Sequence, residues 1–187
     1  MLKNVLKYAP ICALVLAVAS FVFMMAAHAL EMSASGSGAA AAGWISGVAA
    51  IFGKGPYYSS GSASWGPISI SGGGEGSFDG KLAWNALLAF IFFIVALLAL
   101  IVSAVSVFVK IPVLEKFGGI IALAAAGLLL VGGIFLFFTL PAFAQANEWN
   151  NSDGWRLGVG WIIAAILAIL AGVASAFPAV LALVEKK

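Results

Sequence analysis

Four long stretches of this sequence contain no Asp, Glu, Lys or Arg. They are Pro10–Leu30, Leu82–Val109, Phe117–Leu140 and Leu157–Val184. About 20 helical residues cross the hydrocarbon core of a bilayer, so each stretch is long enough to span it. Within that core a helix satisfies its own backbone hydrogen bonds. The sequence therefore predicts an all-α membrane protein, in which residues 1–187 form a single antiparallel bundle of four transmembrane helices.

The overall composition agrees with a membrane protein and argues against nucleic-acid binding. Hydrophobic residues make up 64% of the chain and charged residues 9%, whereas charged residues make up about 25% of a typical soluble domain. The net charge is only +2, and the basic residues form no patch. The expected partner is therefore the lipid bilayer, and no nucleic acid is expected.

The first apolar stretch also has features of a cleaved signal peptide. Lys3 and Lys7 precede it, and Ala27-His28-Ala29 resembles a small-x-small cleavage site. The apolar core of a signal peptide usually has about 7–15 residues, and this stretch is longer. We therefore expect an uncleaved first helix.

The basic residues predict the orientation of the chain, because the cytoplasmic flanks of membrane helices are enriched in Lys and Arg. If the N-terminus is cytoplasmic, the cytoplasmic flanks hold Lys3, Lys7, Lys110, Lys116, Lys186 and Lys187, and the outer segments hold Lys54, Lys81 and Arg156. Both termini are therefore expected in the cytoplasm, as in a multi-pass protein of the plasma membrane. The outer loops are then residues 31–81 and 141–156, and the inner turn is 110–116. Trp161 would lie in the outer headgroup layer, which indole rings prefer.

The first half of the long outer loop has a helical pattern. Ser33–Gly43 is rich in Ser, Gly and Ala, and we expect it to be flexible or to extend the first helix. Trp44–Phe52 is apolar with helical spacing. This pattern predicts a short helix that lies in the membrane interface or packs under a small sheet.

The second half of the loop has a strand pattern. Ile68 and Ile70 alternate with serines between Trp65 and Ser71, as in a half-buried strand. Tyr57-Tyr58 would begin a partner strand, residues 59–64 would form the turn, and residues 72–74 would end the second strand. We therefore predict a small extracellular antiparallel β-sheet of two to four strands.

Small residues recur along the apolar stretches, where close packing joins membrane helices. The last stretch has a ladder at four-residue spacing, made of Gly160, Ala164, Ala168, Gly172 and Ala176. This ladder predicts helix packing, either within one chain or between neighbouring subunits.

Residues that carry out catalysis or bind metals are scarce. The sequence has one histidine, His28, and one cysteine, Cys12, whereas a zinc site needs three or four protein ligands. The carboxylates of the outer loops, such as Glu75 and Asp79, follow no ligand spacing. We therefore expect no catalytic residue, no metal and no cofactor, and the chain is not expected to be an enzyme.

The order of helices and loops is similar to that of the claudin-like tetraspan superfamily. Trp44 matches the first tryptophan of that family's first outer loop, and Trp65-Gly66 matches the start of its Gly-Leu-Trp element. Pro67 stands where the family has leucine, and the second tryptophan and both loop cysteines are absent. The resemblance implies a left-handed four-helix bundle with an outer sheet, used for lateral assembly or adhesion.

The expected function is that of a structural or assembly protein, which self-associates as a homo-oligomer or contacts other membrane proteins. Aromatic residues dominate interface energetics, and the candidate contacts are Trp44, Tyr57, Tyr58, Trp65, Ile68 and Ile70. The same residues could instead form the core of the loop. Two alternatives are an accessory subunit of a larger membrane complex and a claudin-like channel, in which Glu75 or Asp79 would form a selectivity ring.

Overall fold

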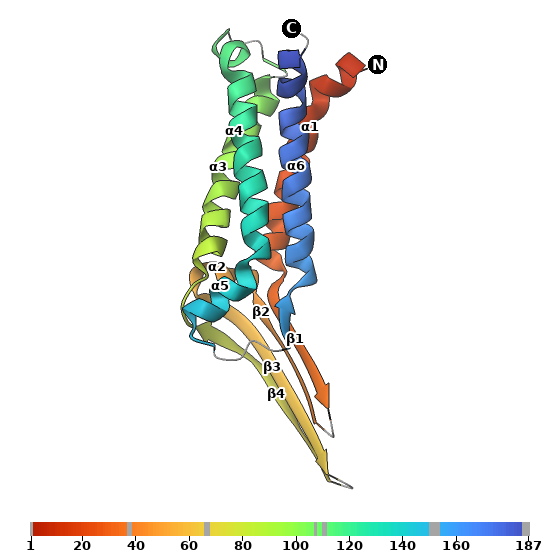
Figure 1. Cartoon of the computed structure of the whole chain (residues 1–187), viewed down its shortest axis with the longest axis vertical. Helices are drawn as coiled ribbons and strands as arrows, with labels where there is room; N and C mark the ends of the chain where they lie inside the picture. Colours follow the sequence, from red (N-terminus) through yellow and green to blue (C-terminus); the bar gives the residue numbers. More distant parts are fainter. Residues whose placement is uncertain are drawn as a thin grey trace. The chain divides into compact units, whose positions relative to one another are not determined.

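The computed structural model describes residues 2–36, 39–65, 68–106, 108–109, 112–149 and 154–184. Its elements are α1 (Leu2–Ala26), β1 (His28–Gly36), β2 (Ala39–Ser46), α2 (Gly47–Phe52), β3 (Lys54–Trp65), β4 (Ile68–Asp79), α3 (Trp84–Ser106), α4 (Pro112–Phe137), α5 (Thr139–Ala146), β5 (Trp155–Leu157) and α6 (Val159–Val184) (Figure 1). They form two compact units. The helical unit comprises Met1–Phe21, Leu88–Phe135 and Ala164–Lys187, and the sheet unit comprises Val22–Leu87 and Leu136–Ile163.

Four helices of the described chain are long and apolar enough to cross a membrane. The segments are Tyr8–Ala26, Trp84–Ser106, Phe117–Phe137 and Val159–Pro178. Their outward-facing side chains are apolar as well, for example Leu98 and Ile120, which are 60% and 65% exposed. Such a surface is unfavourable in water and favourable in hydrocarbon. The chain is therefore a multi-pass membrane protein.

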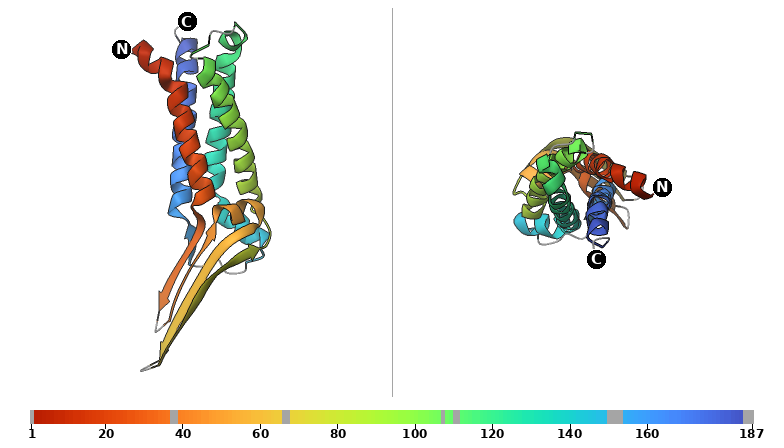
Figure 2. Two further views of the ribbon diagram at one scale, coloured as in Figure 1. Left: turned by 180° about the vertical axis from the view of Figure 1, so that it is seen from behind. Right: turned by 90° about the horizontal axis from the view of Figure 1, so that it is seen from above.

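The helices of the helical unit lie side by side (Figures 1 and 2). Two buried serines connect them: Ser20 of α1 donates a hydrogen bond to the carbonyl oxygen of Ala164 at 2.6 Å, and Ser175 of α6 donates to that of Ala122 at 2.9 Å. Two pairs of stacked rings, Phe21–Phe90 and Phe92–Phe135, have centroids 5.8 and 6.0 Å apart. Hydrogen bonds and close packing of this kind hold membrane helices together.

Several helix boundaries differ by four or more residues from those expected from hydropathy. The helix of the third apolar stretch, α4, begins at Pro112 instead of Phe117, so most of the inner turn expected at 110–116 is helical. The first helix ends at Ala26 instead of Leu30, because His28–Gly36 pairs with neighbouring strands as β1. A helix also continues past Leu140, where a loop was expected, since α5 extends to Ala146. Pro141 lies in the first turn of α5, where its missing N–H costs no helical hydrogen bond.

The sheet unit contains one antiparallel five-stranded sheet with the order β4-β3-β2-β1-β5. The prediction of two to four strands was therefore too low. The structure corrects four further expectations: Ser33–Gly36 and Ala39–Gly43 belong to β1 and β2, Trp44–Ser46 belongs to β2 and not to the short helix, residues 59–64 lie within β3, and residues 72–74 lie within β4. These segments lack apolar alternation, so their strand state depends on cross-strand pairing and not on a local hydrophobic pattern.

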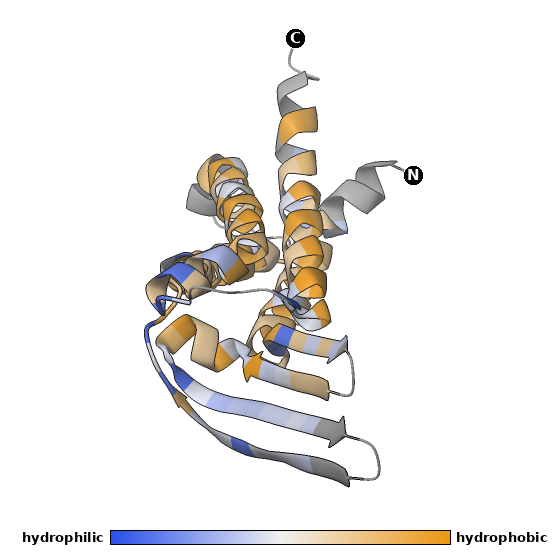
Figure 3. Ribbon diagram, turned by 60° about the horizontal axis from the view of Figure 1, so that its bottom comes forward, coloured by the Kyte–Doolittle hydropathy of each residue, from blue (hydrophilic) through white to orange (hydrophobic). Residues whose placement is uncertain are grey.

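Helix α2 connects β2 to β3, and its ends are capped in the usual way. The Ser46 side chain accepts a hydrogen bond from the backbone N–H of Ala49 at 3.2 Å, which satisfies one free amide of the first turn. Gly53 ends the helix with φ at 74°, in the left-handed region that glycine adopts without strain. Helices carry most of the apolar residues, and β3 and β4 are more polar (Figure 3).

Candidate interaction surface

The pairing register places five side chains in one row across the sheet. Glu75 opposes Tyr58, Tyr58 opposes Trp44, Trp44 opposes Glu31, and Glu31 opposes Arg156. Directly opposed residues of neighbouring strands point to the same face. This charged row therefore runs from the outer strand β4 to the outer strand β5 on one face of the sheet.

Aromatic and ionic contacts order the middle of the charged row. The rings of Trp44 and Tyr58 stack with centroids 6.3 Å apart, and His28 stacks on Trp44 at 4.3 Å. Glu31 lies 3.8 Å from the Nδ1 of His28 and 3.8 Å from the Nη2 of Arg156. Two of the predicted contact residues, Trp44 and Tyr58, thus lie together in a ring ladder that is half-buried.

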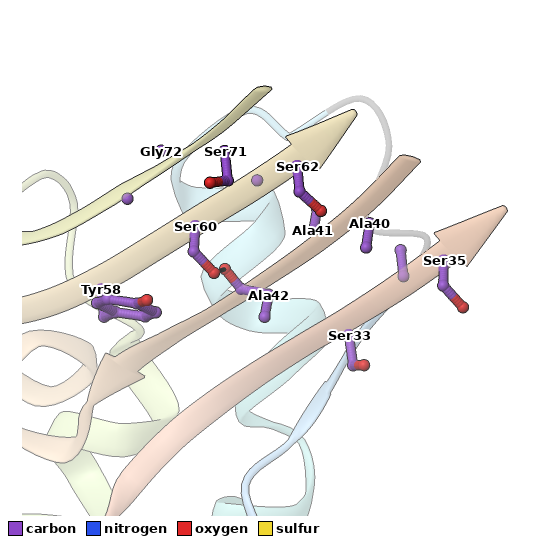
Figure 4. Close-up of a pocket in the computed structure, with 13 residues that line it drawn as sticks. Ser33, Ser35, Ala40, Ala41, Ala42, Tyr58, Ser60, Ser62, Ser71 and Gly72 are labelled. Carbon is purple, nitrogen blue, oxygen red and sulfur yellow. Dashed lines mark hydrogen bonds between the residues drawn. The ribbon is translucent and has the colours of Figure 1, made fainter. Parts of the chain in front are cut away.

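Beyond the charged row, towards the ends of the hairpins, the described side chains on the same face are all small and uncharged. Ser33, Ala42, Ser60 and Gly73 form the next row, and Ser35, Ala40, Ser62 and Ser71 form the one after it. A shallow groove of about 530 Å³ runs over these rows, with Tyr58 among its lining residues (Figure 4). Ser60 donates to the carbonyl oxygen of Ala42 at 3.4 Å. No charged residue lines this groove among the described residues.

Tyr57 lies on the opposite face, because successive residues of a strand alternate. Its ring covers Gly76, where an added Cβ would come within 2.7 Å of the ring. Ile45, which opposes Tyr57, is buried. Tyr57 and Tyr58 therefore cannot belong to a single contact face, although both are candidate contacts. The side chains of Trp65, Ile68 and Ile70 lie outside the described residues, and their backbones pair within the β3–β4 hairpin.

The face that carries Tyr57 also bears an aromatic cluster. Phe143 of α5 packs against Phe78 and Trp149 with centroids 5.3 Å apart in both cases, and Trp149 lies 5.2 Å from Trp155. Phe143 is fully buried. These contacts attach α5 and Trp149 to the sheet.

Asn147, at the end of α5, forms hydrogen bonds with the backbone that follows β4. Its Oδ1 accepts a hydrogen bond from the Lys81 backbone N–H at 2.8 Å, and its Nδ2 donates to the Lys81 carbonyl oxygen at 2.8 Å. The Lys81 ammonium also donates to Glu148 at 2.7 Å. This hydrogen bond and the positive charge lower the pKa of the Glu148 carboxyl below its ordinary value.

The first members of the predicted small-residue ladder face other segments of the same chain. An added Cβ on Gly160 would collide with Ala27, and the Ala164 carbonyl oxygen accepts the Ser20 hydrogen bond. Ala168 lies against Gly133 of α4, and Gly172 lies against Leu130 of the same helix. Ala176 is half-buried.

Trp161 has a structural role that its sequence position did not indicate. Its indole is fully buried within the protein, and it donates to the carbonyl oxygen of Met24 at 2.9 Å. Gly47 packs against that carbonyl group with no room for a side chain. The only signal in the sequence was a tryptophan preceded by Gly158 and Gly160 at the start of an apolar stretch, which does not identify the acceptor.

Within the described residues, His, Cys, Asp and Glu form no group of three or more that could hold a metal ion. No family model matches this chain, and no curated protein matches its sequence. The four apolar helices and the small sheet fit a tetraspan-like topology.

Proposed function

We propose that this chain is a non-catalytic structural protein of the membrane, which self-associates through its sheet. One observation carries the proposal: the twelve-residue strand β4 is the last strand of the sheet. Among the described residues, no strand pairs with its outer side. An open edge strand presents a row of backbone N–H and C=O groups that can pair with another chain.

The composition of β4 supports this use of the edge. Proteins protect their edge strands with charged side chains, above all lysine, and with proline, bulges or short length. The charged residues of β4 are Glu75 and Asp79, both in its second half. Strand β4 is long, contains neither lysine nor proline, and pairs with β3 without interruption from Lys54–Asp79 to Trp65–Ile68. A continuous edge of this kind favours the addition of a further strand.

The proposed location of the sheet is outside the cell, with both termini in the cytoplasm. The lysines at positions 3, 7, 110, 116, 186 and 187 support this orientation, because they flank the helices on the proposed cytoplasmic side. The order of elements resembles that of claudin-like tetraspan proteins, which use an outer sheet for lateral assembly or adhesion. That resemblance supports an assembly role in the plasma membrane.

A second candidate is an accessory subunit of a larger membrane complex. One feature of α4 favours it: an added Cβ at Gly118, Gly119 or Gly127 would meet nothing within 4 Å. Exposed glycines let two membrane helices approach closely. In this alternative a helix of another protein covers α4, and the complex has a fixed stoichiometry with that protein.

Native mass spectrometry of the protein in lipid nanodiscs tests the proposal. We expect oligomers for the unaltered chain and a shift towards monomers for Ser71→Lys, because a lysine on the edge opposes strand addition. The matched control is Ser59→Lys, which places the same charge on the inner strand β3. A strictly monomeric particle in native lipid would contradict self-association, and co-purification with a different protein at a fixed ratio would support the accessory role.

A further inference from the structure

The two outer edges of the sheet carry opposite charges at the same level. Glu75 lies on β4 and Arg156 lies on β5, and both belong to the charged row. Both residues are exposed, and 67% of the Arg156 side chain is accessible. Complementary charges on the two edges of one sheet suit a contact between the β4 edge of one copy and the β5 edge of the next.

The edge next to β5 also offers unpaired backbone. Strand β5 pairs only with Leu30–Met32 of β1. Within the described residues, the outer side of Ser33–Gly36 pairs with no strand. This part of β1 lies beyond the charged row, towards the β1–β2 hairpin. An incoming strand can therefore complete its hydrogen bonds there.

The strand directions allow this contact between copies of the same orientation. Three antiparallel steps separate β4 from β1, so these two strands run in opposite directions within one copy. Two copies that span one membrane in the same sense keep their strand directions. Strand β4 of one copy can therefore lie antiparallel to β1 of the next, which continues the antiparallel pattern.

We propose that the two edges form one head-to-tail interface between copies of this chain, in which Glu75 of one copy pairs with Arg156 of the next. The inference rests on the self-association proposed above and specifies its geometry. In the register that the charge pair selects, Ser71 lies beside Ser35 of the next copy and Gly73 lies beside Ser33. Because the interface is heterologous, it repeats and produces a ring or a filament.

The residues on both edges fit this register. Ser33, Ala34 and Ser35 meet Ser71, Gly72 and Gly73, so small uncharged side chains face one another. The incoming strand must separate from β1 at the point where β5 begins. Gly72 and Gly74 lie near this point, and an added Cβ at either glycine would meet nothing within 4 Å. Glycine leaves the backbone free to bend there. The Arg156 guanidinium has five N–H donors, so it can bind Glu31 of its own copy and Glu75 of the neighbour.

Disulfide trapping tests the register directly. In a Cys12→Ala background, Ser35→Cys and Ser71→Cys are made in two differently tagged chains and oxidised in the membrane. Opposed residues of antiparallel strands have Cα atoms about 4.5–5.5 Å apart, which is within disulfide range. We expect a cross-linked pair only when both variants are co-expressed. A Ser71→Cys chain that cross-links to itself would show a two-fold β4–β4 contact and would overturn the head-to-tail arrangement.

Charge reversal provides an independent readout. We expect Glu75→Arg and Arg156→Glu each to lower association by about three- to tenfold, and the double reversal to restore it. Asp79→Arg, on the same strand but outside the charged row, is the control and should leave association nearly unchanged. If the chain still forms oligomers, both charge reversals leave association unchanged and no mixed cross-link forms, this interface is overturned but self-association is not. A monomeric chain would overturn both proposals.

Discussion

Trp161 and Met24, 137 positions apart in the chain, are joined by a hydrogen bond from the indole N–H to the Met24 carbonyl oxygen at 2.9 Å. Met24 lies in the last turn of α1, and Trp161 lies in the first turn of α6. A helix leaves the carbonyl groups of its last turn without intrahelical partners, and the Trp161 indole satisfies one of them. This contact connects the end of α1 to the start of α6 within the sheet unit.

Loss of this hydrogen bond should destabilise the protein. Trp161→Phe keeps an aromatic ring but leaves the buried Met24 carbonyl oxygen without its donor, which costs about 1–3 kcal/mol. The measurement is the free energy of unfolding by steric trapping in lipid bicelles. Val159→Ala, at an exposed position of the same helix, should have little effect. An unchanged free energy for Trp161→Phe would show that the hydrogen bond makes no net contribution.

Gly47 and Gly127 should respond to alanine in opposite ways. A Cβ at Gly47 would collide with the Met24 carbonyl group, whereas a Cβ at Gly127 would meet nothing within 4 Å. Overpacking costs about 1–3 kcal/mol or more, so Gly47→Ala should lower the yield of folded protein. Gly127→Ala replaces a helical glycine and should be neutral or stabilising by up to about 1 kcal/mol. Thermal unfolding in detergent compares the two variants, and equal stability would contradict the packing at Gly47.

The two interhelical serines should each make a small and separate contribution. Ser20→Ala and Ser175→Ala remove hydrogen bonds to Ala164 and Ala122. Hydrogen bonds between membrane helices contribute about 0.6 kcal/mol on average. The free energy of unfolding lost in the double variant should equal the sum of the two single losses, because the two hydrogen bonds share no residue. A strongly non-additive result in steric trapping would indicate that the two sites are coupled.

The Asn147 side chain should protect the Lys81 backbone amide from hydrogen exchange. Asn147→Ala removes both hydrogen bonds to the Lys81 backbone, and amide exchange at Lys81 should become faster. Asn147→Asp keeps the acceptor for that N–H and loses the donor to the Lys81 carbonyl oxygen, so it should retain most of the protection. Hydrogen exchange measured by mass spectrometry distinguishes the two variants. Equal protection in both would show that Asn147 does not hold this segment.

The Lys81–Glu148 contact should be sensitive to acid. Because the pKa of Glu148 is lowered in the folded chain, the contact contributes above the ordinary pKa of a glutamate. The contribution is lost as the pH falls through the lowered value. Titration of the Glu148 carboxyl by NMR should show the lowered pKa, and Lys81→Met should raise it towards the ordinary value. A pKa that does not respond to Lys81→Met would contradict the assigned cause.

Hydropathy alone was sufficient to identify the four helices that can cross a membrane. Charge is absent from these stretches, and an apolar helix needs no partner to satisfy its backbone in lipid. The small-residue ladder of the last stretch was also visible in the sequence. The sequence did not show which segment each residue of the ladder faces. In the structure, Gly160 faces Ala27 and Gly172 faces Leu130.

The sequence predicted a small antiparallel sheet, but only the tertiary structure decided its extent, its strand order and its edges. Ser33–Gly36, Ala39–Gly43 and the Gly72–Gly74 run are strands because neighbouring strands supply their hydrogen bonds, and Ser, Ala and Gly carry no hydrophobic alternation that predicts this state. The row that aligns Glu75 with Arg156 likewise depends on the registers of four strand pairs. Hydropathy is a local property of the chain, whereas strand pairing depends on hydrogen bonds between backbone groups that are far apart in the sequence.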